Sequence, residues 1–141
     1  MMTVRLVFLV ATLVTSGCAS SGSSAPPDDA IEISMRDNRF DPSNVTVKRN
    51  ATVTFLFVNR GSLDHEAFIG DSKEQKAHER AMGADGEMSD HGHMAADDSV
   101  TVRPGKRATL EHRFTKAGKT WIGCHEPGHY DAGMRIEVTV T

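Results

Sequence analysis

The stretch "AGKTWIGCHEPGHYDAGMRIEVTV", Ala117 to Val140, gives the clearest indication of the fold. Its two ends alternate apolar and polar residues, which is the period of a β-strand with one buried face. Between these ends lie the eleven residues from Cys124 to Met134, which hold one Cys, two His, one Glu, one Asp and one Met. The stretch therefore predicts two strands joined by a loop that gathers metal-binding or reactive side chains.

The same alternation continues toward the N-terminus. Five further segments share it: IEISM, NVTVK, ATVTFLFVN, SVTVRP and RATLEHRF. They are rich in Val, Thr, Ile and Phe, and polar turn sequences such as DPSN, NRGS and RPGK separate them. Asn50 lies in one such turn, where we expect a positive φ that Asn tolerates. Seven or eight short, evenly spaced strands predict an all-β, antiparallel β-sandwich.

One segment departs from this pattern. Residues 71–98 contain almost no β-branched side chains. Their first part, Lys73 to Met82, favours a helix, and the remainder is rich in Gly, Asp, His and Met, which is typical of a loop. We therefore expect a partly helical insert between two strands.

The N-terminus has the pattern of an export signal. Arg5 supplies one positive charge, and Leu6 to Val14 form an apolar segment too short for a bilayer, which takes about 20 apolar residues. Small residues then precede Cys18. This pattern resembles a bacterial lipoprotein signal, with cleavage between Gly17 and Cys18 and lipidation of the cysteine.

This interpretation divides the chain into a signal peptide at residues 1–17, a flexible Ser/Pro linker at 18–29 and one folded domain at 30–141, which includes the 71–98 insert. The mature protein is then expected to be lipid-anchored at the periplasmic or cell-surface face of a bacterial membrane. Ordinary secretion with an unmodified Cys18, and an uncleaved membrane anchor, remain as alternatives.

Charge and cysteine usage narrow the functional classes. The net charge of −3 argues against a nucleic-acid partner. The chain has two cysteines, so lipidation of Cys18 would leave Cys124 without a disulfide partner in an oxidising compartment. Metal ligation is the simplest reason to keep such a cysteine.

Three chemistries compete for the Cys124 to Met134 loop. Zinc prefers four ligands in paired motifs, and the sequence offers no second Cys nearby. A thiol nucleophile needs a base and an orienting group, and no orienting group is evident. A blue-copper site uses two His, one Cys and a weak axial Met. Cys124, His129 and Met134 supply three of these ligands, and His65, which starts an apolar strand after a turn, supplies the fourth.

Two motifs together resemble a known family. "FDPSNVTVKRNATVTFLFVNRGSLDHEAFIG", followed by the C-terminal stretch quoted above, is similar to the cupredoxins of the plastocyanin/azurin superfamily, with a ligand loop like that of rusticyanin. The resemblance covers residues 31–70 and 99–141. It implies a Greek-key sandwich with one type 1 copper ion bound by four residues: His65, Cys124, His129 and Met134.

The resemblance also implies a role. The copper would cycle between Cu(II) and Cu(I) and carry electrons between redox protein partners at the membrane surface. No small-molecule substrate would be transformed, so the protein would not be an enzyme. The small and apolar residues around His129, which are Pro127, Gly128, Tyr130, Ala132 and Gly133, would form a port for electrons, or they would only shape the turn.

Some residues depart from the family pattern or have no family role. Glu66 stands where several members have Asn or Ser that braces the Cys loop. His125 follows Cys124 directly, and we expect it to point away from the metal. Glu126 and Asp131 are expected to be loop residues. Outside the loop, we expect Trp121 in the core and His112 on the surface.

The insert supports a second hypothesis. Six of its residues carry thioether or imidazole groups, which suit copper: His78, Met82, Met88, His91, His93 and Met94. They would form a second metal site, or the segment would be a polar loop. A metal-binding insert would favour a copper chaperone, buffer or resistance protein over an electron carrier.

Overall fold

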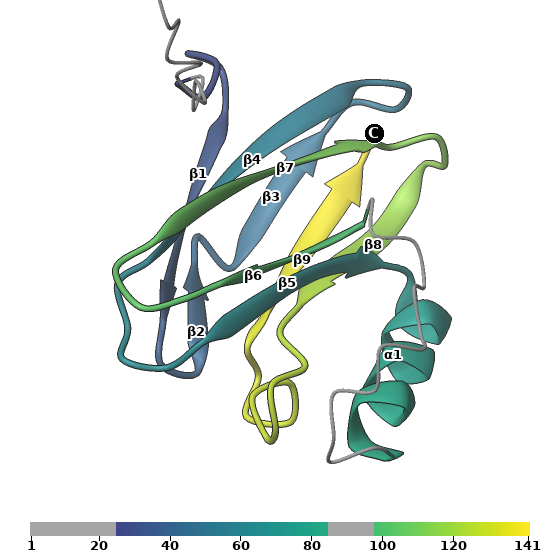
Figure 1. The fold of residues 1–141 in the computed structure, drawn as a ribbon. Helices are drawn as coiled ribbons and strands as arrows, with labels where there is room; N and C mark the ends of the chain where they lie inside the picture. The colour runs from purple at the N-terminus through teal and green to yellow at the C-terminus, as the bar shows by residue number, and fades with distance from the viewer. Residues whose placement is uncertain (1–24, 85–97) are drawn as a thin grey trace, which may run out of the picture.

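The computed structural model of the chain describes residues 25–84 and 98–141, and in this part of the chain two β-sheets pack face to face (Figure 1). The first sheet has the strand order β2-β1-β4-β7. Its strands are, in that order, Arg39–Asp41, Ile31–Arg36, Thr52–Asn59 and Arg107–Arg113.

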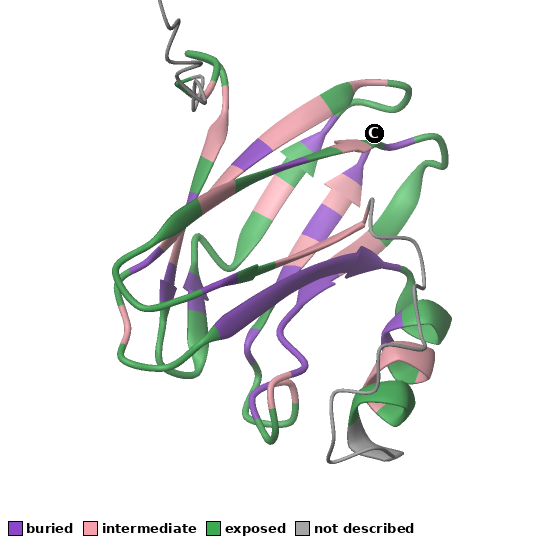
Figure 2. Ribbon diagram, in the orientation of Figure 1, coloured by how far each residue is buried: buried purple, intermediate pink, exposed green. Residues whose placement is uncertain are grey.

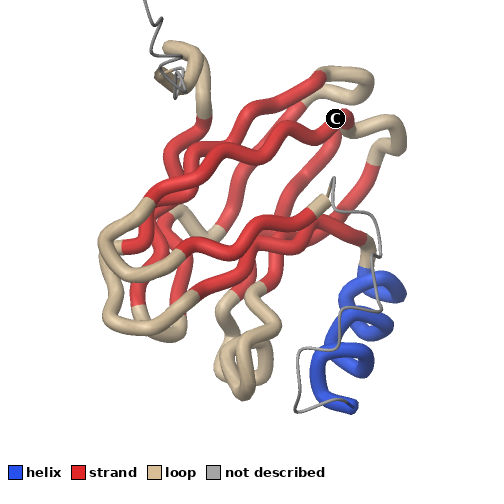
Figure 3. The backbone as a smooth tube through the Cα atoms, in the orientation of Figure 1, coloured by secondary structure: helices blue, strands red, loops and turns tan. Residues whose placement is uncertain are grey.

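The second sheet has the order β3-β9-β8-β5-β6. Its strands are Asn44–Val47, Arg135–Val140, Gly118–Gly123, His65–Gly70 and Ser99–Val102. One helix, α1 (Ser72–Ala84), follows β5 and lies at the same end of the sandwich as the loop between β8 and β9 (Figure 3). In residues 25–84 and 98–141, the structure contains no helix with the length and hydropathy of a membrane span.

The predicted all-β Greek-key sandwich is confirmed, and every predicted strand is present. Asn50 has the expected positive φ, at 65°. The short strand β2 was not predicted, because three residues are too few to show an alternation.

Two strand pairs, β1 with β4 and β3 with β9, are parallel, so both sheets are mixed rather than purely antiparallel. Parallel neighbours arise here because the chain crosses to the other sheet between them.

The core lies between the sheets and follows from the alternation. On β4, the fully buried Phe55 and Phe57 point inward, and their ring centroids are 6.0 Å apart. Phe114 packs edge-on against Phe55, and Phe40 packs against Phe57. Burial of each such side chain contributes roughly 1.5–3 kcal/mol. These aromatic side chains all come from the first sheet or the residue that follows β7, and they form its inward-facing layer of the core.

Strand β5 is buried along its whole length, unlike its neighbours (Figure 2). Ala67 and Ile69 are in the core cluster between the sheets. Glu66 and Phe68 point to the opposite face, as alternation requires, and they are buried as well because α1 packs over that face. Helix α1, the first part of the 71–98 insert, therefore forms a second layer over this sheet.

Helix α1 confirms the predicted helix between Lys73 and Met82. Asp71 caps its N-terminus, since Asp71 Oδ1 accepts bonds of 2.9 Å from the N–H groups of Lys73 and Glu74. Glu74 Oε2 in return accepts the Asp71 N–H at 2.7 Å. This reciprocal arrangement satisfies three N–H groups at the helix start. The same bonds lower the pKa of Asp71.

The prediction that Trp121 lies in the core is wrong. Its neighbour Ile122 is fully buried, and alternation along β8 then turns Trp121 to the outer face of the sheet, where it is half-buried. Trp121 pairs there with Glu137 on β9 and with Gly70 on β5. The outer face of β8 is thus the face that α1 approaches.

Candidate metal centre

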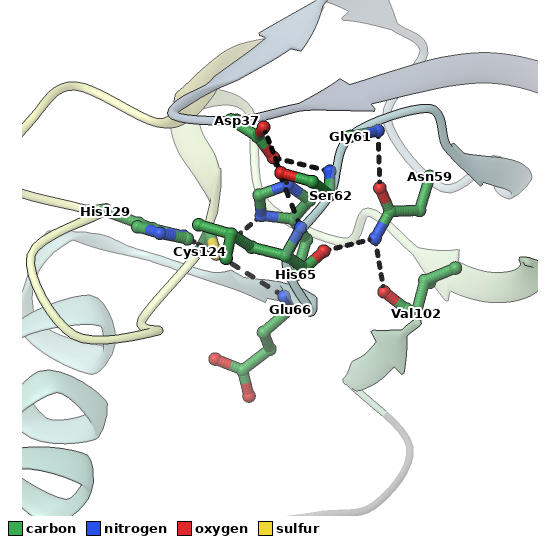
Figure 4. Close-up of polar contacts among 10 residues, drawn as sticks. Asp37, Asn59, Gly61, Ser62, His65, Glu66, Val102, Cys124 and His129 are labelled. Carbon is green, nitrogen blue, oxygen red and sulfur yellow. Dashed lines mark hydrogen bonds and ion pairs between the residues drawn. The ribbon is translucent and has the colours of Figure 1, made fainter. Parts of the chain in front are cut away.

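Three buried side chains that are distant in sequence converge at one end of the sandwich (Figure 4). His65 is the first residue of β5, Cys124 follows β8, and His129 lies in the loop that leads to β9. Cys124 Sγ is 3.9 Å from His65 Nδ1 and 3.4 Å from His129 Nδ1. Within the described residues, this is the one group of three or more Cys, His or acidic side chains with such converging donor atoms.

The spacing of these atoms fits a metal ion. Bonds of about 2.3 Å to sulfur and 2.0 Å to nitrogen, as zinc makes with these ligands, would separate sulfur from nitrogen by about 3.7 Å in a trigonal plane. The two observed sulfur–nitrogen distances, 3.9 and 3.4 Å, lie on either side of that value. One thiol and two imidazoles suit copper, which favours this donor set with a weak axial thioether.

Met134 closes the loop that carries two of these side chains. It is fully buried and belongs to the same core cluster as Cys124. Its carbonyl accepts the Cys124 N–H at 3.1 Å, and its own N–H donates to the His129 carbonyl at 3.0 Å. Gly133, with a φ of 93°, makes the turn before it. The loop therefore folds back on itself and brings Met134 beside Cys124 and His129.

The loop before His65 is braced by a buried amide that sequence reasoning missed. Asn59 Nδ2 donates to the carbonyls of Leu63 and Val102 at 2.8 and 2.7 Å, and Asn59 Oδ1 accepts the Gly61 N–H at 2.9 Å. These bonds fix the entrance to β5 (Figure 4). A signal was present, since Asn59 occupies an inward position of an otherwise apolar alternation on β4.

Asp37, which sequence reasoning also missed, holds the same loop from the other sheet. Its carboxylate accepts bonds from the Ser62 hydroxyl and N–H at 2.8 and 2.9 Å. These bonds lower the pKa of Asp37. Asp37 Oδ1 also lies 3.5 Å from His65 Nε2, the ring nitrogen that faces away from Cys124. The His65 ring thus meets a carboxylate on one edge and the thiol on the other.

Burial favours the uncharged forms of two of the three side chains, His65 and Cys124. Burial, followed by the nearby charge of His129, lowers the pKa of His65. Burial raises the pKa of the Cys124 thiol to about 11, although the Glu66 N–H, 3.4 Å from Sγ, acts in the opposite direction. The thiol therefore carries its proton near neutral pH, and a metal ion must displace that proton to bind.

The flanking residues of the loop take different positions. His125 points away from the site, as predicted, but it is buried against α1 rather than lying free in the loop. Glu126 is half-buried, and burial followed by the charge of Glu66 raises its pKa. Asp131 is exposed, as expected for a loop residue. Outside the loop, His112 is only partly exposed, since its Nδ1 lies 2.8 Å from Asp98 Oδ1.

The residues around His129 are divided between exposed and half-buried positions. Pro127, Gly128, Ala132 and Gly133 are exposed, and Tyr130 is half-buried. His129 itself is 8% exposed. Small, exposed residues therefore precede and follow His129 in the loop, which is compatible with the predicted port for electrons.

The structure describes two of the six residues assigned to a second metal site. His78 Nε2 lies 2.9 Å from Glu66 Oε1, and the His78 ring stacks on Phe68. Met82 is 43% exposed. The other four residues, Met88, His91, His93 and Met94, lie outside the described residues, as does Cys18. The second metal site and the lipidation of Cys18 stay predictions.

Comparisons with known proteins show the family to which the chain belongs. The profile of the cupredoxin-like domain family matches residues 5–83. The copper-resistant cuproprotein CopI of Rubrivivax gelatinosus is 38% identical over 120 residues, which cover 84% of this chain and 70% of that protein. CopI of Pseudomonas aeruginosa is 34% identical over 142 residues, which cover 83% of this chain and 78% of that protein.

Solved structures show the same fold. The reduced auracyanin of Roseiflexus castenholzii superposes with a TM-score of 0.67 at 21% identity, and the match covers 82% of this chain and 99% of auracyanin. The family profile, the relatives above 30% identity and the sandwich topology all agree. The chain belongs to the cupredoxin family.

Proposed function

We propose that this chain is a copper protein in which four residues bind one type 1 copper ion: His65, Cys124, His129 and Met134. The observation that carries the proposal is the convergence of two buried imidazole Nδ1 atoms on one buried thiol. Bound copper would supply a one-electron Cu(II)/Cu(I) couple. The names of the CopI relatives, which describe cuproproteins, support the choice of metal.

The chain's own residues suit such a couple. The Cys124 thiolate and the two imidazoles favour Cu(II), and the thiolate with the Met134 thioether favours Cu(I). The backbone bonds of the loop and the Asn59 amide hold the ligands in one arrangement. A site that is already fixed between the preferences of both oxidation states needs little rearrangement when an electron arrives or leaves.

Electron transfer is the role that this arrangement supports best. The exposed residues Pro127, Gly128, Ala132 and Gly133 would form the port at which a redox protein approaches His129. Leu63, two residues before His65, is 49% exposed and would add apolar surface to this end of the sandwich. No small-molecule substrate would be transformed, and the net charge of −3 speaks against a nucleic-acid partner.

Copper handling is the second candidate function. The two CopI relatives are named copper-resistant cuproproteins. The His and Met residues of the 71–98 insert would then capture copper as a chaperone, buffer or resistance factor does. In either role, we propose that the protein works at the periplasmic or cell-surface face of a bacterial membrane and is held there by lipid on Cys18.

The first prediction concerns the thiolate. The Cu(II)-loaded protein should show an intense visible thiolate-to-copper charge-transfer band. Cys124→Ser should abolish this band because a hydroxyl group replaces the sulfur donor. Met134→Leu should keep the band and shift the redox potential, since the axial ligand tunes that potential. Absorption spectra and redox titration measure both effects, and a band that persists in Cys124→Ser would contradict the ligand assignment.

The second prediction concerns pH. Copper affinity should rise about tenfold per pH unit from about pH 7 toward pH 10, because the metal must displace the Cys124 proton. The sign follows from the pKa of about 11: below it, each increase in pH raises the thiolate fraction. The lowered pKa of His65 leaves that ligand neutral in this range. Competition with a chelator of known pH dependence measures the slope, and a flat profile would argue against the proton displacement.

The third prediction separates the two functions. The wild-type protein and a variant lacking residues 82–94 should both bind one copper ion, because the four ligands lie outside the deleted segment. Copper titration with metal analysis of the purified proteins gives the stoichiometry. If the wild type binds more than one copper and the deletion removes the excess, copper handling through the insert replaces electron transfer as the preferred function.

The fourth prediction concerns the anchor. Cys18→Ala should release the protein from the membrane fraction and prevent incorporation of a labelled fatty acid, because the lipid would be attached to this sulfur. Cys124→Ser serves as the control, since it removes the other cysteine and should leave labelling intact. Equal labelling of the wild type and Cys18→Ala would rule out the lipoprotein assignment.

A further inference from the structure

Helix α1 contacts the residues on both sides of Cys124 and the residue that donates a hydrogen bond to its sulfur. We propose that Gln75, His78 and Glu79 of α1 are positioning residues that fix the Cys124 thiolate, and thereby set the spectrum, affinity and redox potential of the bound metal. The proposal rests on the proposed function, since it requires Cys124 to be a metal ligand.

Gln75 is the fully buried residue of α1 that joins the helix to the sheet. Its Nε2 lies within hydrogen-bond distance of three carbonyls, those of Phe68 at 3.1 Å, Gly70 at 3.3 Å and Trp121 at 3.0 Å. These acceptors fix the orientation of the amide, so that Oε1 faces His125. Gln75 Oε1 lies 2.7 Å from His125 Nε2, which must therefore carry the hydrogen of this bond.

Several side chains contact the buried ring of His125. Its Nδ1 contacts the carboxylate of Glu79, one turn further along α1. Its ring stacks on Tyr130 at 4.6 Å between centroids with an interplanar angle of 16°. The ring of His78 meets it edge-on at 4.9 Å. These contacts with α1 and Tyr130 thus favour one orientation of the residue that follows Cys124.

Gly123, which precedes Cys124, packs closely against Gln75 and Tyr130. A Cβ atom at this position would lie 2.5 Å from Gln75 Oε1 and 2.7 Å from Tyr130 Cε2. Both distances are too short for a side chain, so glycine is what permits the close approach of Gln75. The two neighbours of Cys124 are therefore both packed against Gln75 and Tyr130.

The third contact involves Glu66, which is hydrogen-bonded to the Cys124 sulfur. The N–H of Glu66 donates to Cys124 Sγ at 3.4 Å. The Glu66 carboxylate is bound to His78 Nε2 at 2.9 Å, and the His78 ring stacks on Phe68 at 4.1 Å with an angle of 7°. Because Glu66 and Phe68 lie on one face of β5, His78 fixes the strand that carries the N–H···S bond.

Through these contacts, α1 is expected to influence the redox potential and the affinity of the bound copper. Hydrogen bonds around the Cys sulfur tune the potential of a blue-copper site. Loss of residues that orient a metal ligand typically weakens metal binding by about 10-fold to 100-fold. A helix that only stabilised the fold would change the unfolding temperature and leave the spectrum and potential of the folded, loaded protein unchanged.

The test uses variants of partly exposed α1 residues in the full chain. Glu79→Ala removes the contact to His125 Nδ1, and Glu79→Gln restores a hydrogen-bonding group of the same shape. His78→Phe keeps the stack on Phe68 but removes the bond to Glu66. The exposed residues Lys76 and Arg80 of the same helix give the controls Lys76→Ala and Arg80→Ala. Each protein is loaded with Cu(II), and its charge-transfer band, redox potential, copper affinity and unfolding temperature are measured.

The expected result is specific to the positioning residues. Glu79→Ala and His78→Phe should shift the band and the potential and weaken copper binding about tenfold. Glu79→Gln should restore most of the wild-type values, and the two controls should match the wild type. Shifts in unfolding temperature alone, with unchanged band and potential, would overturn the proposal while leaving the copper site intact. A wild type without the charge-transfer band would overturn both the proposed function and this inference.

Discussion

The antiparallel pairing of β5 with β8 brings together the two segments that carry His65 and Cys124. The register that places Phe68 opposite Gly123 brings the start of β5 to the end of β8. His65 and Cys124, which are 59 residues apart in sequence, thereby lie within 3.9 Å of each other. The loop between β8 and β9 then needs only to fold back on itself to add His129 and Met134. The candidate metal centre is therefore a consequence of strand register.

The outer face of the same two strands explains the second layer. Alternation turns Glu66 and Phe68 on β5, and Trp121 and Gly123 on β8, away from the core. Helix α1 covers part of that face and buries Gln75 against three of the sheet's carbonyls. A buried amide without partners would be costly, so these bonds select one position for the helix. The insert is in this way tied to the site by the thirteen residues of α1.

Several features could be predicted from the sequence because they are local. Period-two alternation identified the strands, and the absence of β-branched residues identified the helix. The spacing from Cys124 to Met134 marked one side of the site, and the turn before an apolar strand marked His65. The bracing residues Asn59 and Asp37 could not be predicted in the same way. Asn59 joins the loop that follows it to Val102 of β6, and Asp37 binds Ser62, which is 25 residues away in sequence. No spacing pattern in the sequence records such long-range contacts.

Alternation and residue type can be followed along the chain, so they were enough to predict every strand except β2, the sandwich class and the four candidate ligands. What surrounds these ligands depends on the tertiary structure. It turned Trp121 outward, it made two strand pairs parallel, and it buried His125 between α1 and Tyr130. Each of these outcomes depends on which segments become neighbours in space. Neighbours of that kind are set by packing and hydrogen bonding across the whole domain, which no single stretch of residues specifies.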